Sequence, residues 1–222
     1  MSEFLQYLAN KTSQDDRIPP LADLSHELGV SIAMLREQME VARALGLVEV
    51  TPKTGIKRLP YTFKPAVRQS LNYAVSTNRA YFSIFADLRR HLEQAYWFEA
   101  VTLLSRQDHE RLRELIRKAQ EKLAGEPVQI PHGEHREFHL LIYRRLDNPF
   151  VSGILETYWE LYEAVGLAVF TDYNYLQTVW KYHEKMVESI CIGDYPTGYQ
   201  ALIDHMDLLQ QRSKPVTNQK FE

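Results

Sequence analysis

The chain has 222 residues, a formal net charge of −3 and one cysteine, Cys191. That length allows one large domain or two modest ones, the charge excludes a globally basic nucleic-acid binder, and a single cysteine excludes an intrachain disulfide. No uncharged apolar run approaches the length of a membrane span, and the opening residues MSEFLQ lack the basic region of a signal peptide. We therefore expect a cytoplasmic protein with no membrane partner.

The first sixty residues predict a small helical unit that ends in a hairpin. Apolar residues at helical spacing predict helices over 4–10, 20–28 and 32–45, and Gly29 suits the left-handed end of the second. Ser31 is placed to cap the third helix. Two short strands, 47–50 and 56–59, flank the turn TPKTG. A helix, a glycine-containing turn and a capped helix form the helix-turn-helix pattern, and the hairpin adds a wing, so residues 1–60 are expected to be a winged helix-turn-helix domain.

In a winged helix-turn-helix domain, the second helix of the motif enters the major groove of DNA. The hairpin carries Lys53, Lys57 and Arg58, which are placed to meet phosphates or the minor groove. A solvated charged hairpin on a small helical domain would carry the same residues. These three cations therefore do not establish DNA binding by themselves.

The same unit resembles the N-terminal domain of the GntR family of bacterial transcription regulators. The resemblance rests on the segments LADLSHELGVS and LREQMEVARALGLVEVTPKTG. It implies that Arg36 contacts a base or a phosphate and that Gly55 forms the tip of the wing. The DNA-binding residues that we expect are Ser31, Arg36, Arg43, Lys53, Gly55, Lys57 and Arg58. At 32–34 the family usually has a polar or basic trio ending in proline, whereas this chain has Ile, Ala and Met, which predicts an unusual operator or weaker DNA binding.

The second half of the chain predicts helices only. Residues 61–66 lie in the proline-containing stretch LPYTFKPA and are the expected linker to a domain over 67–222. Apolar periodicity and breakers predict helices over 67–78, 81–104, 108–123, 131–148, 150–173, 176–192 and 196–211. The side of the 81–104 helix that we expect to be buried carries Phe82, Phe85, Leu88, Leu92 and Ala95. This half is therefore expected to be an antiparallel helical bundle, and the whole chain to be mainly α.

Four histidines fall in the predicted helices of this bundle. His135 and His139 lie one turn apart on one face of a helix, and His183 and His205 lie in two later helices. Four imidazoles from three helices are able to converge on one transition-metal ion. A histidine pair spaced by four, taken alone, is more often two surface or core residues than a metal site.

This half resembles the FCD effector domain of one large GntR subfamily. The resemblance rests on DLRRHLE at 87–93, HREFH at 135–139 followed by LDNP, YHEKMVESI at 182–190 followed by GD, and His205. It implies a metal bound by His135, His139, His183 and His205, with His135 standing where the family has an aspartate. His132 and Glu134 are the alternatives to His135.

The resemblance also implies an effector-binding role for Arg89, whose guanidinium is able to pair bidentately with a carboxylate. The alternative is an exposed arginine that pairs with Asp87 or Glu93. Three nearby aromatic residues are expected to fill the bundle core rather than line a pocket: Tyr158, Trp159 and Tyr162.

All-nitrogen ligation favours zinc, nickel, copper or cobalt over oxygen-preferring cations, and zinc or nickel is the expected cofactor. Four neutral imidazoles cancel none of the charge of such a cation, so we expect a small carboxylate as the effector. The predicted function is a homodimeric regulator that binds an inverted-repeat operator with an affinity set by that effector. The alternative is a metal-dependent hydrolase or isomerase. The winged helix and the lack of a clear general base favour the regulator, so we expect the protein not to be an enzyme.

Overall fold

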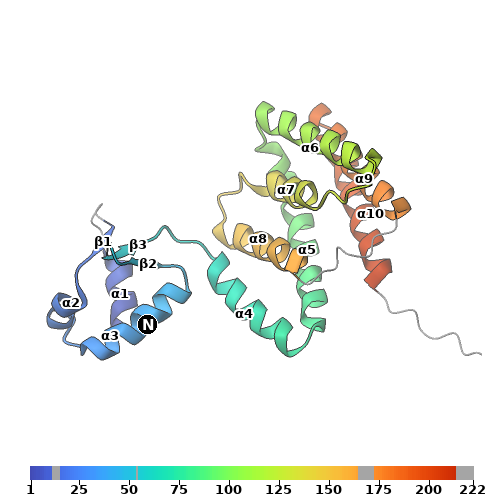
Figure 1. Cartoon of the computed structure of the whole chain (residues 1–222). Coiled ribbons are helices and arrows are strands. Elements are labelled where there is room, and N and C mark those ends of the chain that lie inside the picture. Colours follow the sequence, from blue (N-terminus) through green and yellow to red (C-terminus); the bar gives the residue numbers. More distant parts are fainter. Residues whose placement is uncertain (12–15, 54, 165–172, 214–222) are drawn as a thin grey trace, which may run out of the picture. The chain divides into compact units, whose positions relative to one another are not determined.

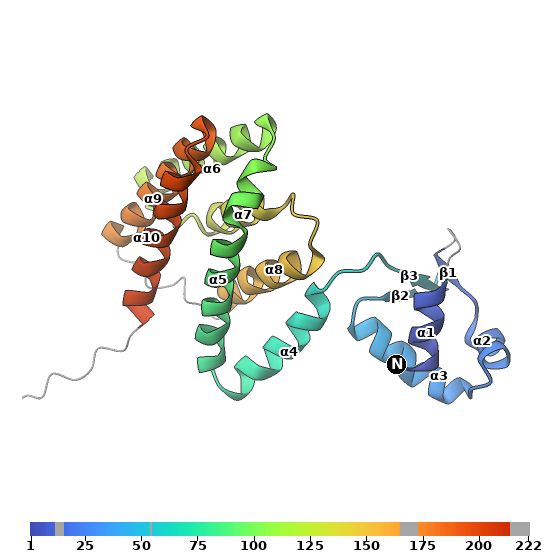
Figure 2. The ribbon, with the colours of Figure 1, turned by 180° about the vertical axis from the view of Figure 1, so that it is seen from behind.

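The computed structural model describes residues 1–11, 16–53, 55–164 and 173–213, and the chain divides into two compact units, 1–74 and 75–222 (Figures 1 and 2). The division falls within helix α4 (Lys64–Thr77). This helix begins inside the expected linker 61–66, three residues earlier than the predicted start at Val67. Pro65 lies in its first turn, where the missing backbone N–H leaves no helical hydrogen bond unmade.

The N-terminal unit contains the predicted helix-turn-helix. Its helices are α1 (Glu3–Asn10), α2 (Leu21–Leu28) and α3 (Ile32–Ala44). Gly29 ends α2 with a φ of 68°, and its N–H donates to the carbonyl of Ser25 at 3.1 Å. The Ser31 hydroxyl accepts from the N–H of Met34 at 3.2 Å and caps α3. The glycine turn and the serine cap therefore set where α2 stops and where α3 starts.

The wing is the predicted hairpin with one strand more than expected. Strands β2 (Val48–Thr51) and β3 (Gly55–Arg58) pair antiparallel, with Val48 opposite Arg58 and Thr51 opposite Gly55. Strand β1 (Arg17–Ile18) pairs with the free edge of β3. Two residues are too few to show a periodicity, so the sequence did not indicate β1. The core beneath the sheet contains Phe4, Leu8, Ile18, Leu24, Leu35, Ala42, Val48 and Ile56.

The second unit is the predicted helical bundle. Its helices are α5 (Ala80–Thr102), α6 (Arg106–Ala124), α7 (His132–Tyr143), α8 (Pro149–Ala164), α9 (Tyr173–Ile192) and α10 (Tyr195–Ser213). Helix α5 packs against α7, α8 and α10, while α6 packs against α7 and α9. The end of the helix expected over 150–173 falls on 165–172, outside the described residues. None of the described helices is both long and apolar enough to cross a bilayer.

Helix α5 buries Phe82 as apolar periodicity predicted, but the rest of its buried side differs from the prediction. Leu88 is 44% exposed, whereas Arg89 and Glu93 are only 2% and 0% exposed. The prediction was wrong because it assigned charged residues to the solvent side. Here the two charges form an ion pair that faces the bundle interior, and the helix is rotated to accommodate it.

Helix α6 begins earlier than the predicted Asp108 because of a capping box at its first turn. The Ser105 hydroxyl accepts from the N–H of Asp108, and the Asp108 carboxylate accepts from the N–H of Ser105 at 2.8 Å. The same carboxylate also pairs with Arg144 and Arg145, which follow α7. This buried aspartate therefore joins the start of α6 to the end of α7.

Candidate metal centre

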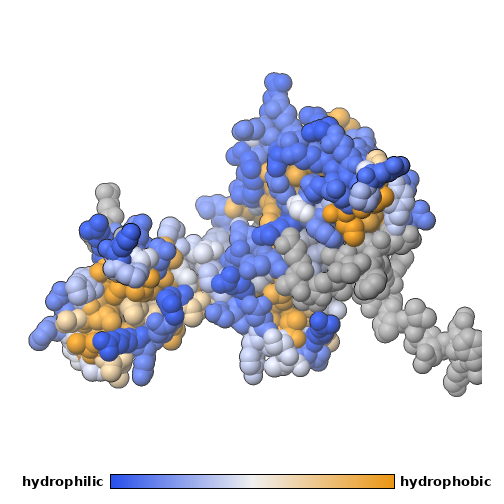
Figure 3. Space-filling view, viewed as in Figure 1, coloured by the Kyte–Doolittle hydropathy of each residue, from blue (hydrophilic) through white to orange (hydrophobic). Residues whose placement is uncertain are grey.

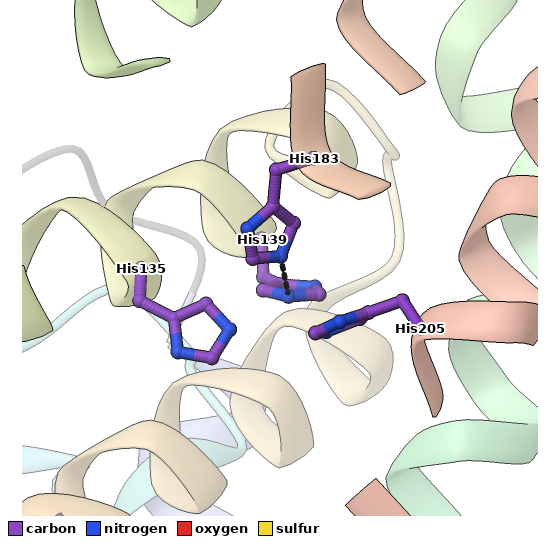
Figure 4. Close-up of side chains that lie close together, drawn as sticks. All are labelled: His135, His139, His183 and His205. Atoms are coloured by element: carbon purple, nitrogen blue, oxygen red, sulfur yellow. Dashed lines mark hydrogen bonds between the residues drawn. The ribbon is translucent and has the colours of Figure 1, made fainter. Parts of the chain in front are cut away.

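The four predicted histidines come together in the interior of the second unit (Figure 4). His135 and His139 extend from α7, His183 from α9 and His205 from α10. One ring nitrogen from each lies within 4.8 Å of the others, and three of the four residues are buried. The Nε2 atoms of His139 and His183 are 3.3 Å apart. The alternatives to His135 lie outside this group, and Glu134 instead pairs with Lys122 at 2.7 Å.

Helix geometry explains why residues so far apart in the sequence meet here. A spacing of four places His135 and His139 on one face of α7. Helices α9 and α10 are joined by a tight turn at Gly193, with a φ of 79°, and pack against each other. His183 and His205 lie at similar distances along the chain from this turn, so the hairpin brings them to the same level.

The histidines have the protonation state that a metal requires. Burial lowers the pKa of His139 below its usual value and lowers the pKa values of His135, His183 and His205 well below theirs. The imidazoles are therefore neutral, which leaves a lone pair on each ring for coordination.

Several of these ring nitrogens lack a hydrogen-bond partner in the part of the chain that the structure describes. Among the described residues, no hydrogen bond reaches His135 Nε2, His183 Nδ1 or either ring nitrogen of His205. A buried polar atom without a partner costs about 1–3 kcal/mol. A transition metal would bind such nitrogens, and an all-imidazole donor set suits one.

Glu93, which the sequence did not lead us to place at this site, contacts one of the four histidines. Its Oε2 lies 3.1 Å from His139 Nδ1, and both side chains are fully buried. Because a carboxylate only accepts, the proton of His139 is on Nδ1, and Nε2 presents its lone pair to the centre. Burial opposes ionisation of Glu93, but Arg89 and His139 outweigh it and lower the Glu93 pKa. The DLRRHLE segment contained the signal, since a spacing of four places Glu93 beside Arg89 on one face.

Arg89 lies in the same interior rather than at the surface. Its Nε is 3.5 Å from Glu93 Oε1, and its guanidinium carbon lies 4.5 Å from the Tyr158 ring centre and 5.3 Å from that of Trp159. The alternative prediction had the right partner but the wrong exposure, since Arg89 is buried and Asp87 pairs with Arg90. The positive charge of Arg89 contributes to lowering the pKa of all four histidines. Two of the three aromatic residues expected in the core, Tyr158 and Trp159, are buried there, and Tyr162 is partly buried.

The predicted DNA-binding residues all lie in the N-terminal unit, and some of them have contacts within that unit. Ser31 caps α3, and Arg43 pairs with Glu40 at 2.6 Å. Arg58 donates to the carbonyl of Lys11 at 2.6 Å, which ties β3 to the chain that follows α1. Arg36 on α3 and Lys53, Gly55 and Lys57 on the wing are exposed. Gly55 has a φ of 71°, as a tight wing tip requires.

Comparisons with known proteins agree with this architecture. The sequence profile of the FCD domain family matches residues 85–208. A solved structure of Streptococcus agalactiae GntR is 15% identical, with 95% of this chain and 96% of that chain covered and a TM-score of 0.68. Another structure is of Lar, which controls expression of the Listeria monocytogenes agr system; it is 15% identical, with 96% of each chain covered and a TM-score of 0.52. No curated protein sequence matches the chain significantly.

A winged helix-turn-helix unit followed by a helical bundle of this kind is the architecture of a DNA-binding transcription regulator. The chain belongs to the FCD domain family and has the fold of the GntR regulators.

Proposed function

We propose that the protein changes its affinity for an operator when a small carboxylate binds a transition metal held by His135, His139, His183 and His205. The observation that carries this proposal is the convergence of four neutral imidazoles, from three helices, within 4.8 Å. Zinc or nickel is the proposed cofactor, because both accept imidazole nitrogen readily.

The charges around the centre support an anionic effector. The histidines are neutral, and the single negative charge of Glu93 is offset by Arg89. The charge of a divalent cation would therefore remain uncompensated in a buried site, where it attracts anions strongly. Arg89 Nη1 is buried without a hydrogen-bond partner among the described residues, which makes it available to the same anion.

The space beside the centre supports a small effector. A cavity of about 20 Å³ adjoins His135, with Tyr162, Tyr175 and Trp180 in its wall. That volume holds little more than one water molecule. The side chains around the cavity would need to move only a little to admit the carboxylate group of a short organic acid. They would need to move much further to admit a fatty acyl chain.

The nearby carboxylates do not support an enzyme. Hydrolysis at a metal requires a general base that faces the bound water. Glu93 is held by His139 and Arg89, and Glu137 pairs with Arg111 at 2.7 Å. Asp204 accepts a hydrogen bond from Gln200 at 2.8 Å. Each of these three carboxylates is therefore held by another side chain and does not serve as a free general base.

A homodimer that binds an inverted repeat is part of the proposal. Winged helices of a twofold dimer meet half-sites in successive major grooves. Tyr81, Ile84 and Leu88 form an apolar stripe on α5, and they are 47%, 64% and 44% exposed. Their spacing places them on one helical face, which supports pairing with the same face of a second copy.

Linkage connects the two sites. A carboxylate is able to change operator affinity only by binding two arrangements of the dimer with different affinity. The effect is reciprocal, so operator DNA must change effector affinity by the same factor.

The metal is tested by elemental analysis of protein purified without a histidine tag or added metal. We expect about one zinc or nickel per chain, its loss in His183→Ala, and retention in the matched control His91→Ala, whose side chain is 60% exposed on α5. Because a metal that binds only the folded state stabilises it, His183→Ala should also lose the rise in Tm that metal produces in the wild type. Equal metal content in both variants would contradict the site.

The effector is tested by thermal shift with a panel of short organic acids. We expect carboxylates to raise the Tm of the metal-loaded protein and to act much less on chelator-treated protein. An acid that stabilises both forms equally would place the effector elsewhere and leave only the DNA-binding role.

A further inference from the structure

The first turn of α3 is apolar on its solvent side. Residues 32–34 are Ile, Ala and Met, and all three are exposed. Ile32 is 39% exposed and Met34 is 48% exposed, whereas the next residue, Leu35, is fully buried in the core. Figure 3 shows apolar surface over helices α1–α3 among hydrophilic residues. Single exposed apolar residues are common, but a run of three at a functional end of a helix calls for a physical explanation.

The position of this turn indicates which molecule covers it. In a helix-turn-helix, the N-terminal residues of the second helix are those that reach base edges in the major groove. Gly29 and the Ser31 cap set the start of α3 here, and Ile32, Ala33 and Met34 follow at once. Arg36 is exposed one turn further on, next to the exposed Glu37, and the wing exposes Lys53 and Lys57. It is therefore the place of this turn in the helix-turn-helix, at the end that enters the groove, that indicates duplex DNA as its partner.

The chemistry of the groove then limits what such a tip recognises. All four bases present hydrogen-bond donors or acceptors in the major groove, and thymine alone among them also presents a methyl group, at C5. Ile and Met side chains cannot satisfy donors or acceptors, and covering those groups without a partner is costly. The thymine methyl group is the largest apolar group that a base edge offers them.

We propose that Ile32 and Met34 are specificity-determining residues that recognise thymine methyl groups in each operator half-site, while Arg36 contacts an adjacent guanine or phosphate. This inference rests on the proposed operator binding and adds the identity of the bases that α3 reads. It also explains the departure from the polar or basic trio that the GntR resemblance leads one to expect at 32–34.

The test begins by selecting bound sequences from a random duplex library with the full-length, metal-loaded chain, with and without the organic-acid panel. The selected inverted repeat should contain thymines at fixed positions in each half-site. Each of these is then replaced by deoxyuridine, which removes only the C5 methyl group. Burying one methyl group corresponds to a change of about fourfold in affinity. Replacing a contacted thymine by deoxyuridine should therefore weaken binding by about that factor.

Two protein variants assign the effect to these side chains. Ile32→Ala combined with Met34→Ala should bind the thymine and deoxyuridine duplexes equally well, with an unchanged salt dependence of nonspecific binding. Val41→Ala is the matched control: Val41 is 52% exposed on the same helix but lies in its C-terminal half, so this variant should keep the methyl preference. Far-UV circular dichroism checks that all variants fold.

The outcomes separate this inference from the proposed function. A selected inverted repeat with no methyl effect at any thymine, or a methyl effect that persists in the double variant, would overturn the inference and leave operator binding intact. If the library yields no preferred sequence at all, operator binding fails and the inference fails with it. Should the double variant instead change only the self-association of the chain, the apolar tip is a protein contact, which also overturns the inference.

Discussion

The substitution Glu93→Gln tests how the buried charges organise the centre. Glu93 is fully buried between Arg89 and His139, and Gln has nearly the same shape but no charge. The amide oxygen still accepts from His139 Nδ1, so the variant removes the charge and keeps one acceptor. Arg89 is left buried without its counter-ion.

The structure gives the expected size of the effect. Removing one partner of a buried ion pair costs about 3–5 kcal/mol, because the remaining charge is uncompensated. For a unit of this size, that loss corresponds to a fall in Tm of roughly 6–20 °C. Loss of a carboxylate that orients a histidine ligand typically weakens metal binding about 10- to 100-fold.

A double variant separates these two effects. Arg89→Met removes the other charge, so Glu93→Gln combined with Arg89→Met should regain much of the stability that either single variant loses. Metal affinity should stay low in the double variant, because no carboxylate holds His139. Asp87→Asn is the control, since it breaks an exposed α5 ion pair with Arg90 and should change stability by less than about 1 kcal/mol.

Chemical unfolding in chelator gives the free energy of unfolding, and competition with a chelating dye gives the metal affinity. If Glu93→Gln unfolds within about 1 kcal/mol of the wild type, the buried pair does not hold α5 in place. If its metal affinity is also unchanged, Glu93 does not position His139.

Three further predictions concern other parts of the chain. Arg36→Ala should weaken specific DNA binding by about 1–3 kcal/mol in a gel-shift titration if Arg36 contacts a base. If the chain forms the proposed dimer, Leu88→Asp should convert it to a monomer in sedimentation, whereas Ile192→Asp, at a site 79% exposed, should not. Asp108→Asn should destabilise the protein by about 2 kcal/mol at pH 7. Burial opposes ionisation of Asp108, but hydrogen bonds from Ser105 and Arg145 outweigh burial and lower the pKa of Asp108 from 3.8 to about 2. A carboxylate whose pKa is lowered by folding stabilises the protein only while the pH is above its pKa in the unfolded state. The free energies of unfolding of the wild type and Asp108→Asn should therefore converge as the pH falls from 3.8 towards 2.

The grouping of the four histidines was predicted through the resemblance to the FCD domain, while helical spacing by itself accounts only for the His135–His139 pair. One turn separates His135 from His139, and the turn at Gly193 brings His183 and His205 to one level. Helix periods and turn residues are local properties that a sequence displays directly. The winged helix was predictable for the same reason, through Gly29 and Ser31.

The buried charges were harder to predict because their stability depends on contacts between distant segments. Glu93 contacts His139, which is forty-six residues away along the chain. An arginine and a glutamate at a spacing of four look like an ordinary surface ion pair until the opposing helix is known. The same limit explains why most of the buried side of α5 was predicted wrongly. Strand β1 was missed because two residues are too few to show a periodicity.

This chain departs from the family pattern at residues 32–34 and at His135. Both lie at surfaces that would contact a ligand, and neither determines the fold. Gly29, Ser31 and Leu35 set the geometry of α3, whereas residues 32–34 face outward. In the second unit, His139, His183 and His205 are fully buried, whereas His135 is only partly buried and adjoins the cavity. A change at an outward or cavity-lining position alters the chemistry that is recognised at little cost in packing free energy. With His135 in place of an aspartate, a bound metal would be one unit more positive, and with Ile32 and Met34 in place of polar residues the two side chains offer no hydrogen-bonding groups. The fold therefore follows from the family, while the effector and the operator have to be argued from these few side chains.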